Sequence, residues 1–338
     1  MGHSISTVQD GVAGMRIFLG VDAGGSKTHA LLVDKAGAVL GSGAGGTGNH
    51  QMSGLDSAVR EISQAVCQAL NAAQVEPGQV ELGCFCLAGA DLPQDFHMLQ
   101  SALVGQELAR QVVIKNDSIA ALRSGLTRSW GVAVICGSGF NAAGRGKDGR
   151  EIVLPGLGAI SGDWGGGGDL VIEMIRAVMR AWDGRGRPTM LTRAVLERLG
   201  KSSEEELLSA LYNRKLTRRH MLPLTPLLFD VADAGDSVAR ELVVRMGTEA
   251  GVTANALLRR LDLQDTDAEV VLSGSVFKGR GTLLLDSVRQ VVRAVAPAAR
   301  IARPRLEPVA GAALLALDLS GLSADSAAYA GLEKVFSH

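Results

Sequence analysis

Short apolar runs that end in glycine and polar residues open the chain. Residues 18–21 are apolar and lead into Asp22, a Gly-Gly pair and the triplet Ser26-Lys27-Thr28, and residues 30–33 are apolar again. Apolar runs of this length, bounded by turn residues, are typical of buried strands. We therefore expect a hairpin at residues 18–34 and a third strand at 38–43. Backbone N–H groups at its glycine tip could close on an anion, although an ordinary hairpin needs the same glycines.

A helical period begins near residue 53. Leu55, Val59, Ile62, Val66 and Leu70 recur at a spacing of three to four residues, which predicts a helix with one buried stripe. The patterns that follow predict a strand at 80–87, a helix at 94–110, a strand at 112–114 and a short helix through 120–122. This order predicts a mixed α/β sheet whose three opening strands are antiparallel.

The pattern begins again at residue 131. A strand at 131–136 runs into Gly137-Ser138-Gly139, a second glycine turn with a hydroxyl at its tip. Two such tips suggest a duplicated domain with the tips facing each other across a ligand cleft. We interpret residues 169–261 as a mostly helical packing insertion whose arginine pairs lie on the surface. A strand at 269–273 then enters a turn at Gly274-Ser275, and helices are expected at 282–295 and 310–317.

The length of 338 residues is enough for two domains. We expect a loose leader at 1–14, a first domain at 15–122 and a second domain at 123–320 that carries the helical insertion. Residues 321–338 form a tail that we expect to return to the first domain.

Composition narrows the class of partner. The formal net charge of −1 supplies no basic field, so neither nucleic acid nor a membrane surface is expected and a small molecule is the natural ligand. No apolar run reaches about 18 residues, so we expect a cytoplasmic protein. The cysteines lie in apolar segments without metal-ligand spacing, which favours buried thiols: Cys67, Cys84, Cys86 and Cys136.

Four carboxylates follow strands or lie in turns: Asp22, Asp91, Asp117 and Asp163. Ligands collect beyond the carboxyl ends of strands in sheets of this kind. Phosphoryl transfer needs positioned donors, a divalent cation and a base aligned with the acceptor hydroxyl. Asp117 directly follows a buried strand and is our candidate for that base, although an Asp before a helix is also a common N-cap. Asp163 lies in a glycine-rich loop that could fold over a polyol or be merely a flexible connector, and Asn49 could present a donor and an acceptor to the same polyol.

Several of these segments together resemble a known family. They resemble the N-acetylglucosamine kinases of the BadF/BadG/BcrA/BcrD ATPase group, within the actin, sugar kinase and Hsp70-like fold class. The segments occur in the expected order between about residues 16 and 320: 20–28, Asn49-His50, Asn116-Asp117, 137–141, 156–158 with Gly162-Asp163, and 274–278.

The resemblance implies two ribonuclease H-like domains with mixed sheets flanked by helices, and ATP and Mg²⁺ in a cleft between them. It implies that Asp117 is the base and that Asp22 organises Mg²⁺ through water. The nucleotide ligands that it implies are Gly25, Ser26, Lys27 and Thr28 in the first phosphate loop, Gly137, Ser138 and Gly139 in the second, and Gly274 and Ser275 beside the adenosine. The amino-sugar ligands that it implies are Asn49, Asp91, Asn141, Gly156, Leu157, Gly158 and Asp163.

Two departures from the family pattern leave the sugar open. Glycines occupy positions 165–168, where the family has an acidic Glu-Gly-Ser type of sequence. Ala90 precedes Asp91, where a second glycine is common in the family. We expect phosphorylation of N-acetylglucosamine or glucosamine at the 6-hydroxyl, by a homodimer, although no sequence feature sets the oligomeric state. The alternatives are an ATPase that activates an acyl-CoA dehydratase or reductase through an iron–sulfur cluster, and a non-catalytic regulator that binds nucleotide or sugar.

Overall fold

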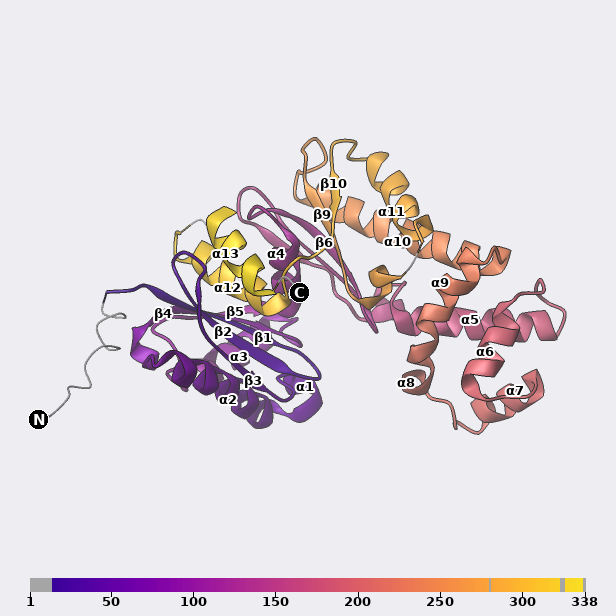
Figure 1. Ribbon diagram of the computed structural model, residues 1–338, viewed down its shortest axis with the longest axis horizontal. Coiled ribbons are helices and arrows are strands. Elements are labelled where there is room, and N and C mark those ends of the chain that lie inside the picture. The colour runs from indigo at the N-terminus through magenta and orange to yellow at the C-terminus, as the bar shows by residue number, and fades with distance from the viewer. Residues whose placement is uncertain (1–13, 280, 323–325, 337–338) are drawn as a thin grey trace, which may run out of the picture. The chain divides into compact units, whose positions relative to one another are not determined.

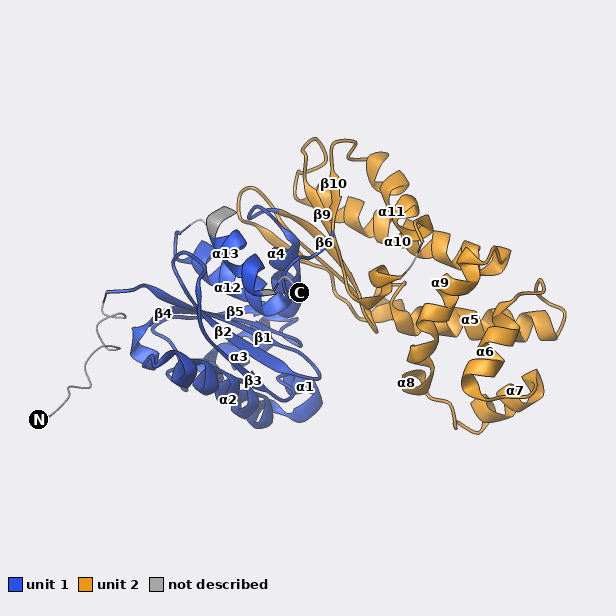
Figure 2. Cartoon of the chain, viewed as in Figure 1, with its two compact units in different colours: residues 1–130, 303–338 blue, residues 131–302 orange. Residues whose placement is uncertain are grey.

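The computed structural model of the chain describes residues 14–279, 281–322 and 326–336, so almost all of the expected leader lies outside the described residues. The chain forms two compact units, each described here by itself (Figure 2). Unit 1 comprises residues 1–130 and 303–338, and unit 2 comprises residues 131–302. Each unit contains one mixed five-stranded sheet with helices beside it (Figure 1), so the expected pair of α/β domains is confirmed.

The sheet of unit 1 has the strand order β3-β2-β1-β4-β5. Its strands are β1 (Ile17–Ala23), β2 (Thr28–Asp34), β3 (Val39–Gly45), β4 (Val80–Leu87) and β5 (Val112–Asn116). The three opening strands are antiparallel, as their apolar runs predict, whereas β1, β4 and β5 run parallel to one another. The helices are α1 (His50–Ser53), α2 (Leu55–Ala73), α3 (Pro93–Val104), α4 (Asp117–Gly125), α12 (Pro308–Leu319) and α13 (Ser326–Phe336).

Alternation along β1 divides its side chains between two faces of the sheet. Ile17, Leu19 and Val21 are buried in one core cluster with the apolar stripe of α2 and with residues of α3. The opposite face is covered by α12 and α4, which also pack against each other. Asp22 shares that second face with Gly20, because the two residues are two positions apart on the strand.

The C-terminal segment that returns to unit 1 begins earlier in the sequence than we expected, at residue 303. The structure corrects the proposed boundaries, since residues 123–130 and 303–320 belong to unit 1 and not to the second domain. Small residues explain the correction: a Cβ atom at Gly20 would lie 2.2 Å from the backbone nitrogen of Ala313, so α12 approaches β1 backbone to backbone. A buried ion pair, Arg123 Nε to Asp318 Oδ2 at 2.8 Å, also joins α4 to α12.

We expect that Gly20→Ala destabilises the protein by about 3 kcal/mol, because the added methyl group has no space between β1 and α12. Urea denaturation followed by circular dichroism measures the effect. Gly78→Ala is the matched control, since a Cβ atom at Gly78 meets no atom within 4 Å and should change the free energy of unfolding little. Equal stability of the two variants would contradict the tight packing.

The sheet of unit 2 has the strand order β10-β9-β6-β7-β8. Its strands are β6 (Gly131–Cys136), β7 (Phe140–Arg145), β8 (Glu151–Val153), β9 (Glu269–Ser273) and β10 (Arg300–Ala302). The helices are α5 (Gly167–Trp182), α6 (Leu191–Leu199), α7 (Glu204–Tyr212), α8 (Arg218–Met221), α9 (Thr225–Asp233), α10 (Ser237–Arg260) and α11 (Leu283–Arg293). The long α10 packs on β6 and β7 and against α11. Short 3₁₀ turns η4 (Leu222–Leu224) and η5 (Ser275–Lys278) precede α9 and follow β9.

Three of the four cysteines are buried as expected. Cys84, Cys86 and Cys136 lie inside strands, whereas Cys67 is exposed on α2, which corrects the prediction for that thiol. Cys84 and Cys86 share one face of β4, with their sulfur atoms 3.8 Å apart. No helix among the described residues is long and apolar enough to cross a membrane.

Candidate active site

The parallel strands of unit 1 bring three of the predicted carboxylates to one edge of the sheet. Asp22 is the penultimate residue of β1, Asp91 follows β4, and Asp117 follows β5. The carboxyl ends of these strands meet at the same edge because the strands run parallel. The charge of Asp91 raises the pKa of Asp117, and the charge of Asp117 raises the pKa of Asp22, so the three carboxylates interact along this edge.

Asp117 is the first residue of α4 but not its cap. The cap is Asn116, whose side-chain oxygen accepts a hydrogen bond of 3.0 Å from the Ser118 N–H. Burial, together with the negative charge of Asp91, raises the pKa of Asp117 to about 6. A carboxyl with this pKa is mostly ionised at neutral pH yet is a stronger base than an exposed Asp, which suits proton abstraction from a hydroxyl.

Asp22 carries an unfavourable charge at the same edge. Burial, followed by the charge of Asp117 and partly offset by the nearby Lys27, raises its pKa to about 7. A bound cation would relieve both the burial and the repulsion between these carboxylates. Among the described residues no three His, Cys, Asp or Glu side chains form a metal cage, but Mg²⁺ needs only one or two carboxylates when phosphate and water supply the other ligands. Asp22 therefore fits that ion.

Asp91 and Asn49 lie in one hydrogen-bonded cluster. Asn116 Nδ2 donates to Asp91 Oδ1 at 2.9 Å and Gln51 Nε2 donates to Asp91 Oδ2 at 3.4 Å. Asn49 caps α1 through its side-chain oxygen, which accepts from the Gln51 N–H at 2.8 Å. The cluster closes on Gly89, whose backbone has a φ of +86°, and a Cβ atom there would meet Asn49 and His50 at 3.1 Å. Asn116 thus ties Asp91 to the start of the helix that carries Asp117.

The first glycine turn is closed by a hydrogen bond of 2.9 Å from the Gly24 N–H to the Lys27 carbonyl oxygen. Ser26 and Lys27 are exposed at its tip, and Gly25 packs on Met52 of α1. Thr28 is fully buried, and its hydroxyl donates to the Gly46 carbonyl oxygen at 2.9 Å. The structure therefore corrects the expectation that the Thr28 hydroxyl faces a phosphate, since that group supports the neighbouring loop.

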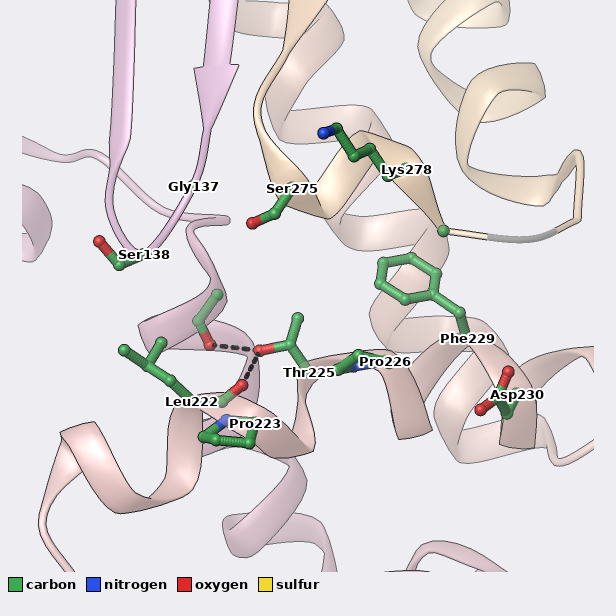
Figure 3. Close-up of a pocket in the computed structure, with 12 residues that line it drawn as sticks. Gly137, Ser138, Leu222, Pro223, Thr225, Pro226, Phe229, Asp230, Ser275 and Lys278 are labelled. Atoms are coloured by element: carbon green, nitrogen blue, oxygen red, sulfur yellow. Dashed lines mark hydrogen bonds between the residues drawn. The ribbon is translucent and has the colours of Figure 1, made fainter. Parts of the chain in front are cut away.

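Unit 2 contains a cavity of about 640 Å³ beside the second glycine turn, within the usual range for small-molecule sites. Figure 3 shows Ser138 on one side of it, Ser275 and Lys278 on η5, and Phe229 on α9. The lining comes from both predicted turns and from the helical insertion: Gly137, Ser138, Gly167, Leu222, Pro223, Thr225, Pro226, Phe229, Asp230, Ser275, Lys278 and Gly279. Mostly apolar walls with an aromatic ring and a few polar groups suit a nucleoside.

The glycine run at 165–168 supports the second glycine turn. Gly167 N–H donates to the Gly137 carbonyl oxygen at 2.8 Å, and Gly168 N–H donates to the Ser138 carbonyl oxygen at 3.0 Å. A Cβ atom at Gly166 would lie 2.5 Å from the Gly139 carbonyl carbon. The positive end of α5 thus lies directly behind the turn, which favours an anion in front of it. The glycine run differs from the family pattern, and its close packing against the second glycine turn explains why side chains are absent there.

The remaining predicted sugar ligands lie in unit 2. Asn141 is the second residue of β7 and contacts Gly156, since a Cβ atom at Gly156 would lie 2.4 Å from Asn141 Oδ1. Gly156 and Gly158 have φ values of +67° and +73°, which only glycine adopts readily. Asp163 closes this loop through hydrogen bonds from its N–H to the Gly158 carbonyl oxygen and from the Ser161 hydroxyl to its carboxylate, and Leu157 is exposed on it.

Comparison with known proteins decides the family. The family model described as the BadF/BadG/BcrA/BcrD ATPase family matches residues 19–316. The chain belongs to this family. It is 30% identical to an N-acetyl-D-glucosamine kinase of Dictyostelium discoideum, across 89% of this chain and 98% of the relative. It is 26% identical to an N-acetylmuramic acid/N-acetylglucosamine kinase of Clostridium acetobutylicum, with the same two coverages.

Solved structures place this BadF/BadG/BcrA/BcrD family member in the actin-like fold class. A Chromobacterium violaceum protein provisionally classified as an N-acetylglucosamine kinase superposes with a TM-score of 0.64 at 24% identity, over 89% of this chain and 99% of that chain. A Streptomyces griseus ROK glucokinase superposes with a TM-score of 0.56 at 20% identity, over the same shares. Both units therefore have the expected ribonuclease H-like fold. The chain is a phosphotransferase enzyme of a family that uses ATP.

Sequence reasoning missed the part of the cavity that this BadF/BadG/BcrA/BcrD family member builds from its helical insertion. Residues 222–230 line the cavity, although we had interpreted the insertion as packing only. The available signal was Pro223 and Pro226, which interrupt an otherwise helical pattern, because proline breaks a helix interior and favours a turn. Lys278 and Gly279 were also missed, although they directly follow the predicted turn at Gly274-Ser275.

Proposed function

We propose that the protein transfers the γ-phosphoryl group of ATP to an amino sugar, N-acetylglucosamine or glucosamine, at its 6-hydroxyl. The observation that carries this proposal is Asp117, an ionisable carboxyl in a half-buried position beside Asp22 and Asp91. The names of the two curated relatives, both N-acetylglucosamine kinases, support the choice of sugar.

Asp117 accepts the proton of the sugar hydroxyl as that oxygen attacks the phosphorus atom. The carboxylate is ionised and ready at neutral pH because its pKa is about 6. Its position on the rigid first turn of α4, fixed by the Asn116 cap and by the Arg123 to Asp318 ion pair, limits the motion of the base. Asp22 would hold Mg²⁺ through water, and the ion when bound neutralises charge on the phosphate oxygens.

The nucleotide occupies the cavity of unit 2 in this proposal. Phe229 and the apolar lining contact the base, with Gly274 and Ser275 on the adenosine side. The turn at Gly137, Ser138 and Gly139 presents donors to phosphate oxygens, with α5 behind it. Gly25, Ser26 and Lys27 provide the corresponding turn of unit 1. Such fixed donors stabilise the charge that develops on a phosphoryl group during transfer.

Sugar recognition rests on two sets of residues in the proposal. Asn49 and Asp91 supply an amide and a carboxylate from unit 1, and Asn141, Gly156, Leu157, Gly158 and Asp163 supply a polar loop from unit 2. The carboxylates of Asp91 and Asp163 accept hydrogen bonds from sugar hydroxyls, and side-chain amides can both donate and accept. A site built on such hydrogen bonds discriminates strongly against analogues that lack one partner group.

A panel of sugars tests the proposal directly. Purified protein with Mg²⁺ and ATP should release ADP when N-acetylglucosamine or glucosamine is added, and the 6-deoxy analogue should release none. Phosphorus and carbon NMR of the product should show a phosphomonoester on C6. ADP release that no sugar stimulates would contradict the proposal, and a brown, oxygen-sensitive protein would favour the dehydratase activator. We also propose a homodimer, which analytical ultracentrifugation would test.

Neutralising Asp91 should shift the pH dependence of this reaction. The charge of Asp91 helps to raise the pKa of Asp117, so Asp91→Asn lowers that pKa. The base must be ionised, so activity falls as the pH drops through its pKa, and the acidic limb of kcat/KM should move to lower pH in the variant. We expect a loss of about tenfold in kcat/KM at pH 8 from the missing sugar contact. An acidic limb that stays in place would show that Asp91 does not act on the base.

A further inference from the structure

Arg218, on the four-residue helix α8, lies against the glycine run that begins α5. A Cβ atom at Gly168 would lie 1.9 Å from Arg218 Nε and 2.1 Å from Nη2, so the guanidinium occupies the space that a side chain at position 168 would fill. Its other contact is with Asp169, at 3.3 Å between Nη2 and Oδ1. The absence of a side chain at Gly168 therefore permits this arginine to reach the start of α5.

The same backbone segment supports the second glycine turn. Gly168, over which the guanidinium lies, donates its N–H to the Ser138 carbonyl oxygen at 3.0 Å. Leu222, one helical turn after Arg218, lines the cavity together with Ser138. Gly167 at the start of α5 and Leu222, directly after α8, line the cavity, whereas Arg218 is not itself a lining residue and its guanidinium lies against Gly168, the neighbour of Gly167. Figure 3 shows Lys278 on a different wall, formed by η5.

The ion pair with Asp169 does not prevent Arg218 from binding a second anion. The Arg218 side chain is 53% exposed, and exposed ion pairs contribute little to stability. The second oxygen of Asp169 already accepts from the N–H groups of Gly165 and Gly166, at 3.3 and 3.2 Å. A phosphate oxygen offers a guanidinium a more highly charged acceptor with bidentate geometry. Moving from Asp169 to a phosphate would leave the carboxylate with its two backbone donors.

We propose that Arg218 binds the phosphate groups of the nucleotide in the cavity of unit 2, and exchanges Asp169 for a phosphate oxygen when the nucleotide arrives. This inference rests on the proposed kinase function, because it assigns a further ligand to the same nucleotide site. Arg218 and Arg219 form one of the arginine pairs that we predicted to lie on the surface, and the proposal gives a role to the first of them. Arg219, its neighbour, has no corresponding contact with the glycine run among the described residues.

Calorimetric titration of the full-length protein with Mg²⁺ATP, ADP and adenosine tests the assignment. Arg218→Ala should weaken ATP binding about tenfold or more, as expected for loss of a charge-assisted contact, and leave adenosine binding unchanged. Arg218→Lys should fall between the variant and the wild type, because it keeps the charge but not the bidentate geometry. Arg219→Ala is the matched control and should bind all three ligands normally. Thermal melts establish that each variant is folded.

Two outcomes would overturn the role of Arg218 alone. ATP binding unchanged in Arg218→Ala would show that the side chain does not contact phosphate. Equal losses for ATP and adenosine would show that it only supports the shape of the cavity. A wild-type protein that binds neither ATP nor adenosine would overturn the proposed nucleotide site as well, so the failure of the broader proposal is distinguishable from the failure of this one.

Discussion

Replacing Asp117 by asparagine is expected to lower kcat by about a hundredfold or more while the protein stays folded. The amide cannot accept the proton of the sugar hydroxyl, whereas the helix keeps its cap because Asn116 and not Asp117 performs that role. The apparent pKa of the base, about 6, also predicts that wild-type kcat declines as the pH falls below that value. Sugar-dependent ADP release across a pH series measures both effects.

Asp56→Asn is the control for this experiment. Asp56 also lies in the first turn of a helix, α2, but it is exposed and is none of the residues proposed for the site, so this variant should retain full activity. Near-normal turnover in Asp117→Asn would remove the base from the mechanism. A variant that also loses its thermal transition would show instead that the carboxylate holds α4 in place.

Two glycines at the second turn should respond differently to the same added methyl group. In Gly166→Ala the new Cβ atom would collide with Gly139, so the turn must move and kcat/KM for ATP should fall about a hundredfold. In Gly137→Ala the new atom meets no protein atom within 4 Å, so the thermal stability should hold while the KM for ATP rises about tenfold, because the methyl group fills the space in front of the turn.

Steady-state kinetics at saturating sugar, together with thermal melts, separate the two effects. Gly78→Ala should match the wild type in both measurements, since its added methyl group also meets no protein atom. Normal ATP kinetics in Gly166→Ala would show that the glycine run does not hold the turn. An unchanged KM in Gly137→Ala would show that no phosphate lies in front of it.

The strands and the carboxyl edge of unit 1 could be predicted because their signals are local. Apolar runs of residues 80–87 and 131–136 match β4 and β6 in extent, and the position of Asp117 after such a run places it at the edge. The residues that gather there, Asp22, Asp91 and Asp117, follow from the general rule for parallel strands. The sequence pattern predicts where these three carboxylates lie but not which of them contacts a ligand.

Features that depend on long-range packing could not be predicted. Thr28 resembles its polar neighbours in sequence, and only its pairing with Gly46 shows that its hydroxyl is committed to the protein. The support that the glycine run at 165–168 gives to the second turn was not predicted, because its partners, Gly137 to Gly139, are distant in the sequence. The contribution of Phe229 to the cavity depends on the fold of the whole insertion, which its helical periodicity does not specify.

The late return of the chain to unit 1 has a consequence for synthesis on the ribosome. Residues 131–302 of unit 2 are continuous, so this unit can complete its fold as soon as they emerge. Unit 1 begins to emerge first but must wait for α12, whose small residues cover Gly20 on β1. The half that is translated first is therefore the half that is finished last, and until then one face of its central strand stays uncovered for nascent-chain chaperones to protect.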